Sequence, residues 1–150
     1  MKKQQQFLRN ISYTLDIIII LFAYLIAKKS GHILNLCSIA GQEAYPGGVG
    51  YNATKFAVNG ITKATKMDLH GTGVRVSMIS PGAVKTEFSI TRFKGDEERA
   101  ESVYKGITPL IAEDISEIAT FILNRPEHVI IMDVVVYPTA QSAATMVYRS

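Results

Sequence analysis

The chain has 150 residues, a length that suits a single domain; 47% of them are hydrophobic and 19% are charged, as in ordinary globular proteins. Its formal net charge of +3 comes from scattered residues, which argues against a nucleic-acid partner. The single cysteine, Cys37, excludes an internal disulfide, and its apolar surroundings in the sequence predict a buried, reduced thiol in a cytoplasmic protein.

The first predicted element is an apolar helix near the N-terminus. After the polar start MKKQQQ, residues 17–27 (IIIILFAYLIA) form an uninterrupted apolar run of 11 residues. A helix that crosses a bilayer needs about 20 apolar residues, and a backward extension of this run includes Asp16. We therefore expect a helix that is buried on most of its sides. The alternatives are a membrane anchor and a signal peptide, although AKKSG is a poor cleavage site.

A strand, a loop and a helix are predicted next. Residues 31–38 (GHILNLCS) read as a buried strand of a parallel sheet. The segment that follows, IAGQEAYPGGVG, is rich in turn-forming residues and predicts a loop. Residues 51–70 carry apolar side chains at helical spacing, and Gly71 and Gly73 are expected to end this helix.

The second half of the chain repeats this alternation. Residues 74–79 (VRVSMI) predict a strand, and SPGAVKT after it predicts a strand-end loop, where open α/β sheets bind ligands. Residues 87–107 are highly charged and predict a solvated helix and loop. Residues 112–123 predict a helix that ends before Pro126, and residues 129–137 predict a last, largely buried strand.

Three side chains carry the chemistry of proton transfer: Ser38, Tyr51 and Lys55. The tyrosine and the lysine are four residues apart in the predicted helix, so the phenol and the ammonium project from one face. A free tyrosine keeps its proton until about pH 10, and a cation within about 4–6 Å can lower its pKa by about 1–3 units. Ser38, 13 residues upstream of the tyrosine, can hold a substrate oxygen beside the phenol. This set suits the interconversion of an alcohol and a ketone.

The same residues resemble the signature of the short-chain dehydrogenases/reductases. The segments YPGG, DLHGTGVRV, SPGAVKTEFS and TRFKGDEERA further resemble the branch of NADP-dependent 3-hydroxy acid dehydrogenases, which act on serine-like and 3-hydroxyisobutyrate-like compounds. The resemblance extends from about Lys29 to about Gln141. It implies part of a Rossmann-like, doubly wound α/β fold: about three parallel strands with flanking helices.

The resemblance also implies a role for each site residue. Tyr51 is the general acid–base, Ser38 positions the substrate oxygen, and Lys55 lowers the phenol pKa and binds the nicotinamide ribose. Tyr51 and Lys55 therefore both contact the cofactor, which the resemblance makes NADP, with NAD as the alternative. The loop after the second strand is implied to contact the nicotinamide end through Pro81, Gly82, Val84 and Thr86. No metal site is predicted.

Two further residues are implied at the edges of this site. Asn10 lies 28 residues before Ser38, the spacing of the family's catalytic asparagine, which holds a water in the proton relay. A surface helix cap is the alternative role for this asparagine. Arg92 lies in the segment that forms the family's substrate lid, and its guanidinium suits a substrate carboxylate. The C-terminal tail resembles one that packs against a neighbouring subunit in tetramers.

The sequence shows no glycine-rich turn before residue 10, where the family's dinucleotide-binding half is found. We therefore expect residues 1–150 to be a single catalytic half, with the first predicted strand as an unpaired edge that favours association. On this expectation the chain by itself does not bind NADP measurably, and it forms a homo-oligomer or joins a full-length relative.

Three functions remain open at this stage. The first is the catalytic half of an NADP-dependent dehydrogenase of small 3-hydroxy acids. The second is a catalytically dead interaction or assembly module, and cofactor binding by the chain separates it from the first. The third is a membrane-associated protein anchored through residues 17–27, which solubility without detergent excludes.

Overall fold

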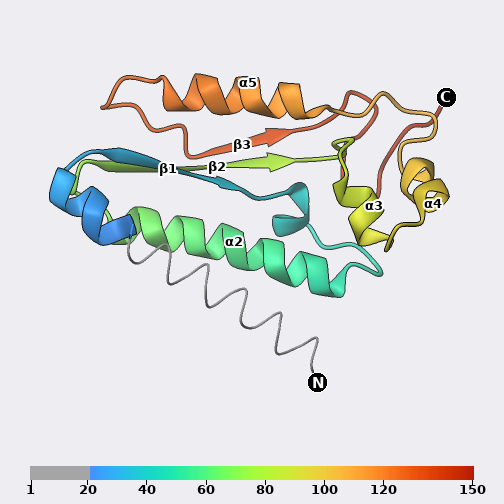
Figure 1. The fold of residues 1–150 in the computed structure, drawn as a ribbon, viewed down its shortest axis with the longest axis horizontal. Coiled ribbons are helices and arrows are strands. Elements are labelled where there is room, and N and C mark those ends of the chain that lie inside the picture. The colour runs from blue at the N-terminus through green and yellow to red at the C-terminus, as the bar shows by residue number, and fades with distance from the viewer. Residues whose placement is uncertain (1–20) are drawn as a thin grey trace.

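A three-stranded parallel sheet forms the centre of the computed structural model, which describes residues 21–150 (Figure 1). The strands β1 (Gly31–Leu36), β2 (Val74–Pro81) and β3 (Asp133–Val136) lie in the order β1-β2-β3, and each neighbouring pair is parallel. Parallel neighbours need crossover connections, and in this chain helices connect each strand to the next. This arrangement confirms the predicted α/β class, a part of a Rossmann-like sheet.

Helices cover both faces of the sheet. The long helix α2 (Val49–Asp68) lies below the strands in Figure 1, and α5 (Ala112–Leu123) lies above them. Three short helices lie beyond the carboxyl ends of the strands: η1 (Ile39–Gly41), α3 (Phe88–Arg92) and α4 (Glu97–Ser102). The carboxyl end of the sheet is therefore the end that is enclosed by loops and short helices.

The core lies along β2 and the N-terminal helical residues. Val76, Met78 and Ile79 on this central strand are almost completely buried. At the opposite end from the short helices, Leu69, Val74 and Val76 form a hydrophobic cluster, and three partly buried side chains pack against it: Phe22, Leu25 and Ile33. Residues 21–28 are helical, so this part of the predicted apolar helix does pack on the sheet.

The prediction that this helix is buried on most sides is wrong for its described part. Leu21, Tyr24 and Ile26 expose 48%, 62% and 41% of their surface, since only one side of the helix contacts the cluster. Among residues 21–150, no helix combines the length and the apolarity that crossing a bilayer requires.

Two predicted strands differ from the observed ones. β1 is parallel as expected but half-buried, and Leu36 exposes 59% of its surface, because β1 pairs with β2 alone among the described residues. β3 begins at Asp133 rather than at residue 129, and its side chains alternate between exposed and half-buried. Before it, the Arg75 guanidinium donates to the carbonyl groups of Leu123, Arg125, Pro126 and Val129. These carbonyls therefore face a side chain instead of a neighbouring strand.

Helix α2 ends just before Gly71 and Gly73, as the sequence predicts. The helix ends at Asp68, and Gly71 and Gly73 then adopt φ values of +79° and +82°, which favour glycine. A side chain at Gly73 would also collide with the backbone of Lys29. The turn from α2 into β2 thus depends on glycine at this position.

Candidate active site

The predicted serine, tyrosine and lysine meet at the carboxyl end of the sheet. Ser38 follows β1 and is the N-cap residue of η1, where its Oγ accepts a hydrogen bond of 3.2 Å from the Ala40 N–H. The same Oγ donates to the Pro81 carbonyl at the end of β2, 3.3 Å away. Ser38 is buried, and its two hydrogen bonds, to η1 and to the end of β2, therefore fix the position of its hydroxyl group.

Tyr51 and Lys55 come from the first two turns of α2 and are both half-buried. The Lys55 Nζ lies 5.8 Å from the centroid of the Tyr51 ring and donates to the Leu36 carbonyl, 3.1 Å away. On its other side, the tyrosine ring packs against Phe88 of α3 at a centroid distance of 5.4 Å. The helix therefore presents both groups from one face, as their spacing predicts.

Burial raises the pKa of the Tyr51 phenol, and the nearby Tyr45 and Cys37 act in the same direction. A hydrogen bond with Ser38 and the charge of Arg92 oppose this shift. The net direction is opposite to the one expected from Lys55 alone, and the cation that opposes burial is Arg92. Burial also lowers the pKa of Lys55 itself. At neutral pH the phenol consequently carries its proton and can act as an acid.

Close packing sets the distance between the serine loop and α2. A Cβ at Gly41 would lie 2.5 Å from the Lys55 carbonyl oxygen and 2.7 Å from the Cys37 Sγ. The Cys37 thiol donates to that same carbonyl over 3.4 Å, and the Asn59 amide donates to the Gly41 carbonyl over 2.9 Å. Cys37 is buried, as predicted, and helps to hold the serine loop against the helix.

The loop after β2 lies beside Ser38, and most of its polar backbone bonds within the chain. Pro81 accepts from Ser38, the Gly82 N–H donates to the Val136 carbonyl over 2.7 Å, and the Ala83 N–H donates to the Gln141 Oε1 over 2.9 Å. The Thr86 Oγ1 accepts from the Phe88 N–H over 3.3 Å. In this structure Thr86 therefore orients the start of α3.

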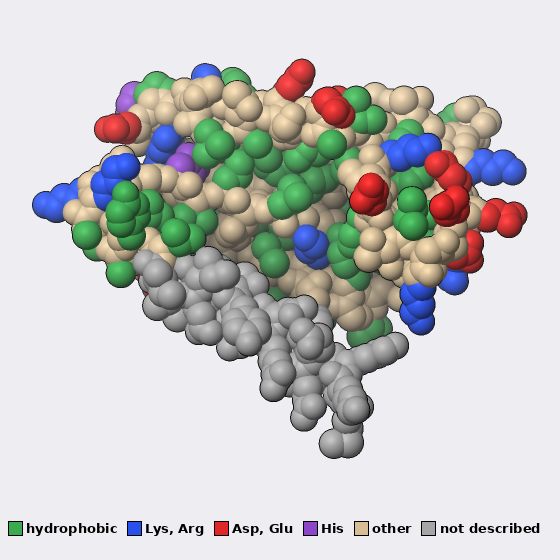
Figure 2. All heavy atoms as spheres, in the orientation of Figure 1, with side chains coloured by type: hydrophobic (Ala, Val, Ile, Leu, Met, Phe, Trp, Pro, Cys, Tyr) green, Lys and Arg blue, Asp and Glu red, His purple; other side chains and the backbone are tan. Residues whose placement is uncertain are grey.

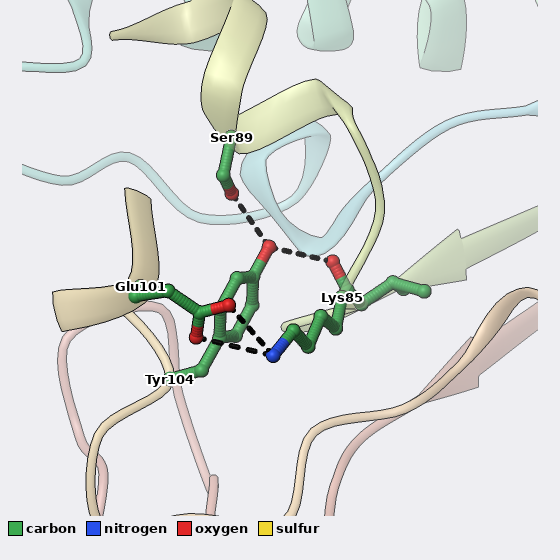
Figure 3. A network of polar contacts seen from close by, with 5 residues as sticks. Lys85, Ser89, Glu101 and Tyr104 are labelled. Atoms are coloured by element: carbon green, nitrogen blue, oxygen red, sulfur yellow. Dashed lines mark hydrogen bonds and ion pairs between the residues drawn. The ribbon is translucent and has the colours of Figure 1, made fainter. Parts of the chain in front are cut away.

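Val84 is held by a polar network that joins this loop to α3 and α4 (Figure 3). The buried Tyr104 hydroxyl donates to the Val84 carbonyl over 2.9 Å and lies 2.5 Å from the Ser89 hydroxyl. Close by, Lys85 and Glu101 form an exposed ion pair of 2.7 Å. A cavity of about 340 Å³ lies beside this network, and Thr86, Ser89 and Tyr104 are among the residues that line it.

Arg92, the last residue of α3, lies close to Tyr51. Its guanidinium carbon lies 5.7 Å from the Tyr51 ring centroid, and its Nη2 donates to the Tyr45 hydroxyl over 3.2 Å. The structure thus brings Arg92 beside Tyr51. Asn10 lies outside the described residues, so its predicted role stays a prediction.

Sequence reasoning missed three residues that shape the site: Gly41, Tyr45 and Asn59. The sequence predicts a loop over the YPGG segment and a resemblance through it, but the turn signal of its proline–glycine pair was not used to predict a fixed position for Tyr45. Asn59 lies eight residues after Tyr51 on the inner face of α2, where a buried amide needs a partner. Gly41 carried no sequence signal, because its close contact is with a residue far along the chain.

Comparison with known proteins identifies the family to which the chain belongs. The sequence profile of the short chain dehydrogenase family matches residues 3–97. An NADP-dependent 3-hydroxy acid dehydrogenase from Schizosaccharomyces pombe is 46% identical over 82% of this chain and 48% of its own length. One from Salmonella typhi is 44% identical over 84% of this chain and 52% of its own length.

A solved structure shares the fold as well. The closed form of a serine dehydrogenase complexed with NADP+ superimposes with a TM-score of 0.78 at 42% identity, covering 84% of this chain and 52% of that one. The chain thus spans about half the length of the relatives it matches. The family match spans the residues that the fold gathers at the carboxyl end of its sheet, and on this evidence the chain belongs to the short-chain dehydrogenase family.

Proposed function

We propose that these residues form the catalytic half of an NADP-dependent oxidoreductase that interconverts a small 3-hydroxy acid and its ketone or aldehyde. The observation that carries this proposal is that the Lys55 Nζ and the Arg92 guanidinium carbon lie 5.8 Å and 5.7 Å from the centroid of the Tyr51 ring, at the end of the sheet where Ser38 follows β1. The names of the S. pombe and S. typhi relatives and of the serine dehydrogenase structure support both the substrate class and the cofactor.

In this mechanism the phenol of Tyr51 is the proton donor and acceptor. During reduction the phenol gives its proton to the carbonyl oxygen of the substrate, and during oxidation the phenolate accepts the proton of the alcohol. Ser38 orients that oxygen, because its own hydroxyl is fixed between η1 and the end of β2. NADP, when bound, supplies or accepts the hydride at the substrate carbon.

The side chains present suit the nicotinamide end of this cofactor. Within the described residues, the Lys55 ammonium donates one hydrogen bond, to the Leu36 carbonyl. Its other N–H groups can therefore bind ribose hydroxyl groups. Within the described residues the Val84 N–H has no hydrogen-bond acceptor, and it lies in the loop predicted to hold the carboxamide. Pro81, Gly82 and Thr86 are proposed to shape this loop around the ring.

Arg92 is proposed to bind the substrate carboxylate. It is exposed, carries a permanent charge and lies over the ring of the proton donor. In a 3-hydroxy acid, a single carbon separates the carboxylate from the carbon that bears the hydroxyl group. A carboxylate on Arg92 would therefore bring the hydroxyl group into the neighbourhood of Tyr51 and Ser38.

The proposal is tested with a chimera, because the chain spans about half the length of its relatives. The remaining half is supplied by the S. pombe enzyme, and NADPH formation is followed at increasing concentrations of serine or 3-hydroxyisobutyrate. We expect turnover with NADP and the hydroxy acids, and none with their deoxy analogues. A well-folded chimera that binds NADPH but oxidises none of these compounds would contradict the proposed reaction.

Replacing Lys55 by methionine in this chimera is expected to move the alkaline limb of the pH–rate profile upward by about one unit. The substitution removes one of the two cations beside the Tyr51 ring, and Arg92 remains as the other. The phenolate is then less favourable, so the phenol pKa rises and the limb follows it. The Michaelis constant for NADP should rise as well. The exposed Lys63 of the same helix is the matched control, and Lys63→Met should leave both quantities unchanged. An unaltered profile and an unaltered cofactor affinity in Lys55→Met would remove Lys55 from both roles.

An assembly role is the second candidate. Among the described residues β1 pairs on one side only, and the face in Figure 2 shows hydrophobic side chains gathered between α5 above and the helices below. Leu36 at the end of this edge is exposed, as are Phe56 and Met67 on α2. A second copy of the chain that covers the β1 edge would bury this surface. Light scattering at increasing concentration distinguishes such an assembly from a monomer.

A further inference from the structure

The YPGG segment forms a fixed turn that presents Tyr45. The Gly48 N–H donates to the Tyr45 carbonyl over 3.2 Å, which closes a four-residue turn. Pro46 occupies its second position and Gly47 its third, where a φ of +76° favours glycine. The turn restricts the backbone of Tyr45 and places its side chain just before α2.

The tyrosine ring has its own support. A Cβ at Gly48 would collide with the ring, lying 2.7 Å from its Cζ and closer still to its Cε2, so the ring lies directly against this glycine. The buried Asn52 amide, in the orientation that satisfies both of its polar atoms, accepts from the Tyr45 N–H at 2.8 Å and donates to the Gly48 carbonyl at 3.0 Å. Helix α2 thus holds the turn that carries Tyr45.

The hydroxyl group of Tyr45 contacts Arg92, at the end of α3. It accepts a hydrogen bond of 3.2 Å from Arg92, whose guanidinium carbon is 5.8 Å from the Tyr45 ring and 5.7 Å from the Tyr51 ring. The guanidinium therefore lies beside two aromatic rings, one on the turn and one on the catalytic helix. Because the Arg92 side chain is exposed, it needs a fixed partner to hold one orientation.

We propose that Tyr45 and Arg92 together form the subsite for the substrate carboxylate. Tyr45 positions the guanidinium and also binds the carboxylate through its own hydroxyl group. The inference rests on the proposed function, which supplies a substrate with a carboxylate. The donors left on the guanidinium fork bind the carboxylate oxygens, and the Tyr45 hydroxyl group can turn its proton toward the same anion. The fixed turn keeps this pair beside Tyr51.

The test uses the chain itself and ligand-observed saturation-transfer NMR, which tolerates oligomers. The probes are 3-hydroxypropionate and its neutral amide, 3-hydroxypropionamide. We expect the acid to bind with about tenfold higher affinity than the amide, since only the acid makes a charge-assisted pair with arginine. Tyr45→Phe should weaken binding of the acid by about fivefold, the effect of one hydrogen bond, and leave binding of the amide unchanged.

Two glycine variants test whether acid binding depends on the position of the Tyr45 ring or falls with any added methyl group in this segment. Gly48→Ala places a methyl group where the Tyr45 ring lies, so it should weaken binding of the acid at least as much as Tyr45→Phe does. Gly50→Ala adds the same methyl group two residues later, into open space, and should change nothing. Arg92→Lys keeps the charge but loses the fork, and we expect about a tenfold loss for the acid.

Equal binding of acid and amide would overturn the proposed subsite. Loss of acid binding in Arg92→Lys, with Tyr45→Phe and Gly48→Ala unaffected, would remove Tyr45 from it. These outcomes are independent of the reaction itself. A chain that shows the expected binding pattern while the chimera fails to oxidise hydroxy acids would refute only the proposed function. A chimera with normal turnover, in which Tyr45→Phe leaves the Michaelis constant for the acid unchanged, would refute only this inference.

Discussion

Tyr51→Phe is expected to lower the turnover of the chimeric enzyme by about 10²–10⁴-fold, the usual contribution of a general acid–base. The substitution removes the hydroxyl group and keeps the ring, so the packing against Phe88 remains. Of the described residues beside the ring, Ser38 is a very weak acid, and the Lys55 ammonium is directed at the Leu36 carbonyl and is proposed to bind the ribose, so neither replaces the lost proton. The measurement is the steady-state rate of NADPH formation at saturating substrate.

The matched control is Tyr137→Phe, which removes a hydroxyl group from the end of the sheet. That hydroxyl donates to Glu43 over 3.0 Å, and among the described residues it makes no hydrogen bond to Ser38 or Tyr51. We expect Tyr137→Phe to keep its turnover within a few-fold of the unmodified chimera. If Tyr51→Phe kept more than about a tenth of the rate, Tyr51 would not be the proton donor.

Gly41→Ala is expected to destabilise the fold by about 1–3 kcal/mol, the usual cost of overpacking. Its added methyl group would lie 2.5 Å from the Lys55 carbonyl oxygen, which belongs to the backbone of α2 and cannot rotate away. The helix must then move from the serine loop, or the loop must give up the hydrogen bond from Asn59. For a chain of this length each kcal/mol lowers the melting temperature by about 2–4 °C, measured by circular dichroism.

Gly50→Ala again serves as the control, since its methyl group meets open space on a helix. Alanine is the better helix former, so we expect an unchanged or slightly higher melting temperature. If Gly41→Ala melted like Gly50→Ala, the serine loop and α2 would be able to separate without cost. The close contact would then have no part in setting the distance between Ser38 and Tyr51.

Most of the fold could be predicted from the sequence. The elements that were placed well have strong local signals: α5 coincides with its predicted range of 112–123, and β1 and β2 begin at their predicted residues. The start of β3 could not be predicted, because the side chain of Arg75, far away in the sequence, binds the carbonyls that precede it. The exposure of β1 likewise depends on which segments lie beside it.

The candidate site likewise has features that the sequence predicts and features that only the tertiary structure shows. By itself the sequence determined that Tyr51 and Lys55 share one helix face and that Ser38 lies at the carboxyl end of a strand, although β1 ends at Leu36 and not at the predicted Ser38. The geometry of helices and strands relates side chains only over a few residues. Only the tertiary structure decided that Arg92 and Tyr45 lie beside the catalytic tyrosine and that Gly41 touches α2. It also decided that burial is the largest effect on the phenol and raises its pKa. The physical reason is that contacts and desolvation between distant segments arise from packing, which no local pattern in the sequence encodes.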